Sequence, residues 1–204
     1  MSEPIPELDS APDVAPQPDR ESTPSDWMML TDPAWTPDGD DAEPPGESLL
    51  GGWPMWTDGS WGRFQANPAY RPLGPDSPSD PVDAVLRMMV RADYGADALL
   101  SVLADTALEI AIDENGVAVV DRAPDGGACV LVVTAPVHRD RVEAADWRGT
   151  HAAEIGEALP PSGVDLLLNP NSPASMRLSA DALREHLAAE PDEASQGPLQ
   201  TEIG

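Results

Sequence analysis

Cys129-Val130-Leu131-Val132-Val133 is apolar at every position and sets the fold of this 204-residue chain. An unbroken apolar run predicts a central strand that is covered on both faces. Val164–Leu168 predicts a second buried strand, and Met176–Leu178 a short one. Upstream, apolar residues recur at every second position over 108–113, which predicts a half-buried strand beside the central one. The sequence therefore predicts a sheet built around residues 129–133.

Helices are predicted on both sides of these strands. Asp80 can cap the first helix, and Pro81 suits its first turn, so the helix should begin there and end near Tyr94-Gly95. The second should span Ala96–Ala104. Shorter helices are expected over 137–147 and 151–159, and a closing helix over 180–189. Helices flanking a mixed sheet predict an α+β domain over residues 80–189.

Residues 26–79 have a different composition. They are rich in proline and glycine, yet they hold five of the six tryptophans. Trp27–Leu30 and Leu49-Leu50 predict short strands. Asp58-Gly59 lies between the apolar runs 53–56 and 61–64, and an Asp-Gly pair in that position predicts a hairpin. We expect a small Trp-rich β subdomain here.

The chain is strongly acidic, with 37 acidic residues, 11 basic residues and a formal net charge of −26. Such a surface repels phosphate backbones and anionic lipids, so nucleic acid and membranes are not expected as partners. A basic protein partner fits this charge better. The acidic, proline-rich residues 1–25 and the tail 190–204 are expected to be disordered, because they cannot bury enough apolar surface to offset the entropy lost on ordering.

The expected location is the cytoplasm. The N-terminus has neither the positive start nor the apolar stretch of a signal peptide. No apolar run approaches the ~20 residues of a membrane-spanning helix. Cys129 is the single cysteine, which fits a reducing compartment. Because Cys129 begins an apolar strand, we expect a buried, unreactive thiol.

The sequence offers no clear catalytic or cofactor-binding set. His138, His151 and His186 have spacings that match no metal motif, so no cofactor or metal is expected. The loop 169–175 is a weaker candidate, since Asn169, Ser172, Ser175 and backbone amides could cradle an anion. Its Asn-Pro and Ser-Pro pairs also explain it as a structural turn.

Aromatic residues supply the candidates for partner binding, namely Trp53, Trp56, Trp61, Phe64 and Tyr70. Aromatic side chains anchor interfaces, and they also fill the cores of small β units, so both roles stay open. Strand alternation places Trp53 and Trp56 on opposite faces. We expect Trp53 to pack inward and Trp56, next to the turn, to be the exposed anchor.

Several of these segments, in order, resemble the SseB-like proteins associated with type VII secretion in actinobacteria. The resemblance is carried by Asp32–Trp35, Gly52-Trp53, Asn67–Pro72, Asp80–Ala84, Tyr94-Gly95, Thr134–His138 and Val164–Leu178. It covers about Trp27 to Leu187. It implies an SseB-like sheet with flanking helices, and a cytoplasmic accessory role without catalysis.

We therefore expect a non-enzymatic accessory protein that acts through protein–protein interaction, with a secretion-system component or substrate as partner. Two alternatives stay open: an enzyme that uses the Asn169–Ser175 loop, and a secreted effector. The missing triad, metal cluster and phosphate loop count against the first alternative. The missing export signal counts against the second.

Overall fold

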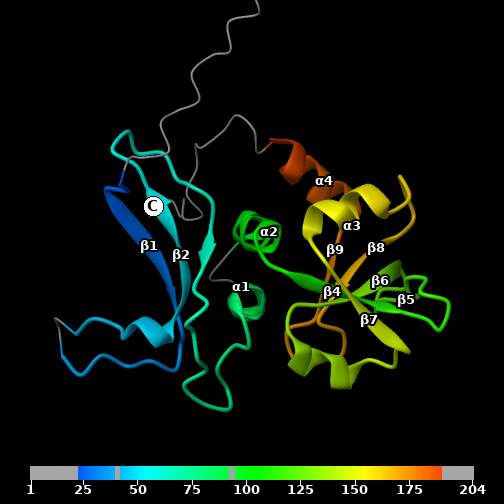
Figure 1. The fold of residues 1–204 in the computed structure, drawn as a ribbon, viewed down its shortest axis with the longest axis horizontal. Helices are drawn as coiled ribbons and strands as arrows, with labels where there is room; N and C mark the ends of the chain where they lie inside the picture. Colours follow the sequence, from blue (N-terminus) through cyan, green and yellow to red (C-terminus); the bar gives the residue numbers. More distant parts are fainter. Residues whose placement is uncertain (1–22, 40–41, 92–94, 190–204) are drawn as a thin grey trace, which may run out of the picture.

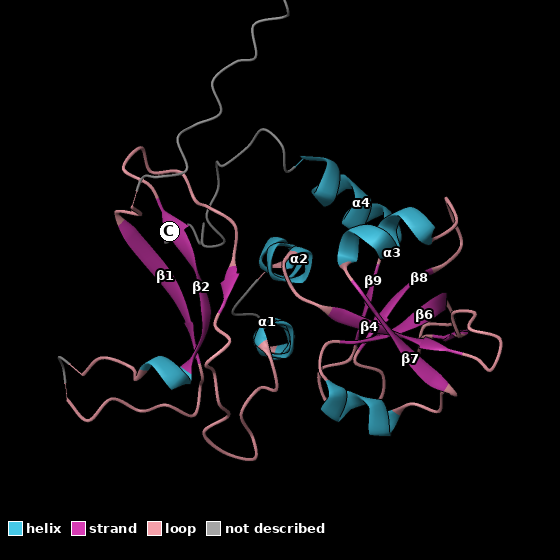
Figure 2. Ribbon diagram, viewed as in Figure 1, coloured by secondary structure: helices cyan, strands magenta, loops and turns pink. Residues whose placement is uncertain are grey.

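The computed structural model describes residues 23–39, 42–91 and 95–189. It has an α+β fold with a three-stranded and a six-stranded sheet. Two helices lie between the sheets and two more cover the larger sheet (Figures 1 and 2). The arm and tail predicted to be disordered fall outside the described residues, except for residues 23–25, and so does Tyr94.

The smaller sheet is formed by the Trp-rich region. Its strands are β1 (Asp26–Thr31), β2 (Leu49–Met55) and β3 (Gln65–Ala66), in the order β1-β2-β3. Both pairings are antiparallel. A short 3-10 helix, η1 (Gly46–Ser48), leads into β2. The strands predicted at 27–30 and 49–50 are thus present, and the second extends through Trp53.

The predicted hairpin forms only at its turn. The Trp56 backbone N–H donates to Ser60 O at 2.9 Å, and Gly59 has a φ of 84°, as a tight turn requires. The second arm was expected to be a strand over 61–64. It is instead irregular, with one bridge from Trp61 to Met55, and pairing with β2 resumes only at β3. The Gly62 N–H donates to the Pro54 carbonyl oxygen at 2.7 Å, but Pro54 has no N–H to return the bond, so the ladder is interrupted there.

The larger sheet has the order β7-β4-β6-β8-β9, with β5 also paired to β6. The strands are β4 (Leu108–Ile112), β5 (Val120–Arg122), β6 (Ala128–Val133), β7 (Asp146–Thr150), β8 (Asp165–Leu168) and β9 (Met176–Leu178). The predicted run around Cys129 is the central strand β6. It is parallel to β8 and antiparallel to β4 and β5.

Helices α1 (Pro81–Val90) and α2 (Ala96–Ala104) pack between the two sheets (Figure 1). Val82, Ala84, Val85 and Leu86 are each at most 1 % exposed, so α1 is buried on more than one face. Helices α3 (Ala152–Ala158) and α4 (Ala180–Ala189) pack together over the larger sheet. None of the described helices is long and apolar enough to span a membrane.

Two local predictions for the larger sheet were wrong. The helix expected over 137–147 is a 3-10 helix, η2 (Pro136–Arg141), followed by strand β7. All five residues of β7 pair with β4, and this long-range pairing overrides the local pattern. Strand β4 was expected to be half-buried, but Ala111 on its other face is fully buried because Trp147 and Val119 cover it.

One apolar cluster runs from the smaller sheet through α1 and α2 into the larger sheet. It includes Leu50 and Trp53 from β2, Val85 from α1 and Leu166 from β8. A second, smaller cluster lies on the opposite face of the larger sheet and contains the fully buried Cys129. Burial raises the pKa of the Cys129 thiol, which favours the protonated form.

Candidate functional site

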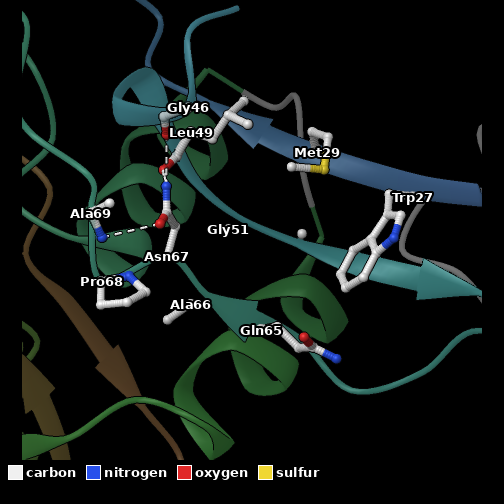
Figure 3. A pocket seen from close by; sticks show the side chains of 11 residues that line it. Trp27, Met29, Gly46, Leu49, Gly51, Gln65, Ala66, Asn67, Pro68 and Ala69 are labelled. Carbon is white, nitrogen blue, oxygen red and sulfur yellow. Dashed lines mark hydrogen bonds between the residues drawn. The ribbon is translucent and has the colours of Figure 1, made fainter. Parts of the chain in front are cut away.

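The outer face of the smaller sheet carries an apolar groove (Figure 3). Strand alternation turns Met28 and Leu30 of β1 toward the core and leaves Trp27 and Met29 on the other face. The two outer side chains are 39 % and 42 % exposed, and they form one wall of the groove. Both side chains lie against Gly52 of β2, and their outer sides stay exposed.

The floor of the groove is made of glycine. A Cβ atom on Gly52 would lie 2.8 Å from the Met28 carbonyl oxygen and 3.0 Å from Met29 Sδ. A Cβ on Gly51 would collide with the Gln65 carbonyl oxygen and the Phe64 ring. The pair therefore permits the close approach of the three strands, with Phe64 against Gly51 and with Trp27 and Met29 against Gly52. The hollow between the two walls has a volume of about 380 Å³.

The opposite wall is residues 65–69, and Asn67 holds it in place. The Asn67 side-chain amide donates to the carbonyl oxygens of Gly46 at 2.7 Å and Leu49 at 2.8 Å, and its oxygen accepts from the Ala69 N–H at 3.0 Å (Figure 3). These bonds tie the chain after β3 to the start of β2. The groove is therefore a fixed feature of the backbone.

Among the described residues, no charged side chain lines the groove. Two polar groups at its rim have no hydrogen bond within the described part of the chain, the indole N–H of Trp27 and the carboxamide of Gln65. The lining is thus suited to an apolar side chain, with two polar groups left to bond a peptide backbone.

Three of the aromatic residues predicted to bind a partner belong to the core. Trp53 is 2 % exposed, stacks at a tilt on Phe64 with ring centroids 4.7 Å apart, and donates from Nε1 to Ser101 Oγ of α2 at 3.0 Å. Tyr70 is buried as well. Burial removes Trp53, Phe64 and Tyr70 from the accessible surface, because a sheet of this size has few other side chains to pack on α1 and α2.

Trp56 and Trp61, the other two candidates, are partly exposed near the turn and do not line the groove. The expectation that Trp53 packs inward is confirmed. Trp27 and Met29 were missed as binding candidates, although the alternation over Trp27–Leu30 already placed them on the opposite face from Met28 and Leu30.

Tyr70 is tied to Asp32 in the core. Its hydroxyl lies 2.9 Å from Asp32 Oδ2 and 2.8 Å from the Pro78 carbonyl oxygen. Burial, followed by the bond to Asp32, raises the pKa of Tyr70. The same carboxylate accepts from the backbone N–H groups of Ala34 and Leu73, so it connects three segments of the Trp-rich region.

A buried polar network lies at the carboxyl ends of the parallel strands β6 and β8, where open α/β sheets often bind ligands. Asn169 follows β8 and donates from Nδ2 to Thr134 Oγ1 at 2.9 Å. Thr134 follows β6 and donates to Asp80 Oδ2 at 2.7 Å. Asp80 also caps α1 by accepting from the Asp83 N–H at 3.0 Å. The network thereby fixes the start of α1 on the edge of the larger sheet.

His138 of η2 completes this network. Ser79 Oγ donates to Asp80 Oδ2 at 2.6 Å and shares a 2.8 Å hydrogen bond with His138 Nε2, which must then be the donor. Burial lowers the pKa of His138, and the carboxylates of Asp83 and Asp80 oppose this shift. His138 Nδ1 has no partner in the described structure, so no carboxylate orients the ring as a catalytic triad requires.

The loop predicted as a possible site is bonded to its own backbone and, through Asn169 and Asn171, to Thr134 and Arg141. The Ser172 N–H donates to the Asn169 carbonyl oxygen at 3.1 Å, and Ser175 Oγ donates to the Leu168 carbonyl oxygen at 3.2 Å. Asn169 and Asn171 have φ values of 45° and 59°, which Asn tolerates in a tight turn. Of Asn169, Ser172 and Ser175, only Asn169 reaches the buried network.

In the described ranges no three His, Cys, Asp or Glu side chains converge as metal ligands would. In the comparisons with known proteins, no family model, curated protein or solved structure matches this chain.

Proposed function

We propose that this chain is a non-catalytic accessory protein that binds another protein through the groove on its smaller sheet. The observation that carries the proposal is the exposed pair Trp27 and Met29 above the glycine floor of β2. Tryptophan and methionine are enriched at the centres of protein interfaces. Exposing both on one strand leaves apolar surface in water, and a docked partner would cover it.

The arrangement supports protein binding over catalysis. The described lining of the groove is mostly apolar and contains no titratable side chain, whereas the buried network uses its polar groups to fix α1 and η2 in place. The resemblance to SseB-like proteins supports a cytoplasmic partner from a type VII secretion system, either a component or a substrate.

The experiment is site-specific photo-crosslinking in the host cell. A photoreactive amino acid replaces Met29 in the groove, and in a matched control it replaces Val120, which is 53 % exposed on β5 of the larger sheet. We expect a crosslinked partner protein from position 29, and we expect that this partner is not captured from position 120. The captured partner is then purified and titrated against wild-type chain, Trp27→Ala and Trp56→Ala.

Affinity should fall at least about tenfold in Trp27→Ala, since a central interface tryptophan is often a hot spot, and should change little in Trp56→Ala. Thermal melting of each variant checks that the fold is intact. Binding lost in Trp56→Ala and retained in Trp27→Ala would overturn the proposal and place the docking surface at the hairpin turn.

A further inference from the structure

We propose that the partner segment is a linear, basic stretch of polypeptide that places a leucine or methionine side chain in the groove, against Trp27 and Met29. This inference rests on the proposed function and adds the chemistry of the partner. The groove runs between the Trp27–Met29 wall and the wall at residues 65–69, with β2 as its floor (Figure 3). The groove is shallow and open, so an extended chain segment can lie along it between the two walls.

The size and lining of the groove define the anchor. Its volume of about 380 Å³ is near the lower end of the range for ligand pockets, so it holds one or two side chains. Met29 Sδ and the Trp27 ring lie directly over Gly52, so an anchor would pack against their outer sides and not against the glycine itself. Leucine or methionine can pack against both, whereas a charged side chain would lose its hydration without finding a partner.

The rim supplies hydrogen bonds that suit a peptide backbone. The Trp27 indole N–H can donate to a carbonyl oxygen, and the Gln65 carboxamide can both donate and accept. They stand on β1 and β3, on opposite sides of the glycine floor. An extended segment lying in the channel can bond to both while its apolar side chain points down.

Charge complementarity favours a basic segment. Residues 26–79 contain nine acidic residues against only Arg63 and Arg71, within a chain of net charge −26. Asp26 and Glu47 are exposed next to the two ends of the groove. Arg71 donates to the backbone carbonyl oxygens of Tyr70 and Pro68, so it is already engaged by the chain itself. Lysines or arginines beside the anchor would meet an attractive field.

The edge of the sheet is a less suitable docking place than its face. Strand β1 is an edge strand, but the Asp26 carboxylate accepts from the Trp27 backbone N–H at 2.8 Å. The edge strand β7 has the same arrangement between Asp146 and Trp147. A bonded N–H beside a negative charge disfavours the addition of another strand. A second copy of the chain is disfavoured too, because it would bring two strongly negative molecules together.

The test selects linear peptides from a phage-displayed random library on the full-length protein, with Trp27→Ala as the counter-screen. Selected peptides are synthesised and titrated by fluorescence anisotropy against wild type, Trp27→Ala, Gln65→Ala and Trp56→Ala. We expect peptides with a leucine or methionine flanked by basic residues. Their affinity should fall at least about tenfold in Trp27→Ala, several-fold in Gln65→Ala and little in Trp56→Ala.

The outcomes separate the two proposals. Peptides that depend on Trp27 but are acidic or uncharged would overturn the partner chemistry and leave groove docking in place. A selection that yields no Trp27-dependent peptide would overturn groove docking itself. Concentration-dependent dimers of the wild type that Trp27→Ala abolishes, seen by sedimentation, would identify a second copy as the occupant and overturn the basic partner.

Discussion

Two tryptophans three positions apart have different surroundings. Trp53 fills the space between β2 and the helices, with its indole N–H bonded to Ser101, whereas Trp56 is partly exposed beside the turn. Trp53→Ala should therefore lower the free energy of unfolding by about 3–5 kcal/mol, from lost burial and the cavity left behind. Trp56→Ala should cost about 1 kcal/mol. Denaturation in urea measures both, and equal losses would contradict this assignment.

His138 should make stability depend on pH. Burial lowers its pKa in the folded state, whereas in the unfolded chain the pKa is about 6.5. As pH falls through that value the unfolded chain binds the proton first, so the free energy of unfolding should decrease below about pH 6.5. Near the ring, Asp83 and Asp80 favour protonation while Arg141 and Arg87 oppose it.

The measurement compares urea midpoints from neutral pH to about pH 5 for the wild type and His138→Gln. The variant is needed because Asp80 has the opposite effect on stability. Burial raises the pKa of Asp80, so its contribution to the free energy of unfolding weakens as pH rises. The wild type should lose more stability on acidification than the variant. His151→Gln, which replaces an exposed histidine, is the matched control and should follow the wild type. Parallel curves for wild type and His138→Gln would contradict the prediction.

At the scale of elements, α1 depends on its cap more than α2 does. Asp80 accepts from the Asp83 N–H and from the hydroxyl groups of Ser79 and Thr134, whereas Gly95 gives α2 no side-chain cap. Asp80→Ala should lower the free energy of unfolding by about 2 kcal/mol. The loss of the cap and the unpaired hydroxyl groups outweigh the stability gained when a carboxylate no longer has to be buried.

Asp97→Ala is the matched control, because Asp97 is an exposed acidic residue in the first turn of α2. Its loss should cost at most about 1 kcal/mol through the helix dipole. Chemical denaturation compares the two variants. A cost for Asp80→Ala no larger than for Asp97→Ala would show that the network adds nothing to stability.

Some helices and strands could be predicted from the sequence, and others could not. α2 spans Ala96–Ala104 as expected, and the strands around Cys129 and Leu166 form as their apolar runs predict, because these patterns are local. Strand β7 was missed because its five residues gain their partners from β4, more than thirty positions upstream. The irregular arm at 61–64 was missed because the contact of Gly62 with Pro54 depends on how the turn closes.

For the whole molecule, charge should limit stability. The net charge is −26, so the acidic side chains repel one another in the compact folded state, and salt screens that repulsion. Adding NaCl from about 0.02 to 0.5 M should therefore raise Tm at neutral pH; each gain of about 1 kcal/mol corresponds to roughly 2–4 °C for a chain of this size. The rise should shrink near the acidic isoelectric point, where the net charge vanishes. A Tm that is unchanged or lower in salt at neutral pH would contradict the prediction.

The sequence by itself determined the strands and helices whose patterns are local, the acidic character of the surface and the inward direction of Trp53. Only the tertiary structure decided that α1 is buried between two sheets and that Asp80, Thr134 and Asn169 meet. Thr134 is 54 positions from Asp80 and 35 from Asn169, and no periodicity encodes contacts over such separations. The groove has the same origin, because Trp27, Gly52 and Gln65 become neighbours only when three strands pair in one register.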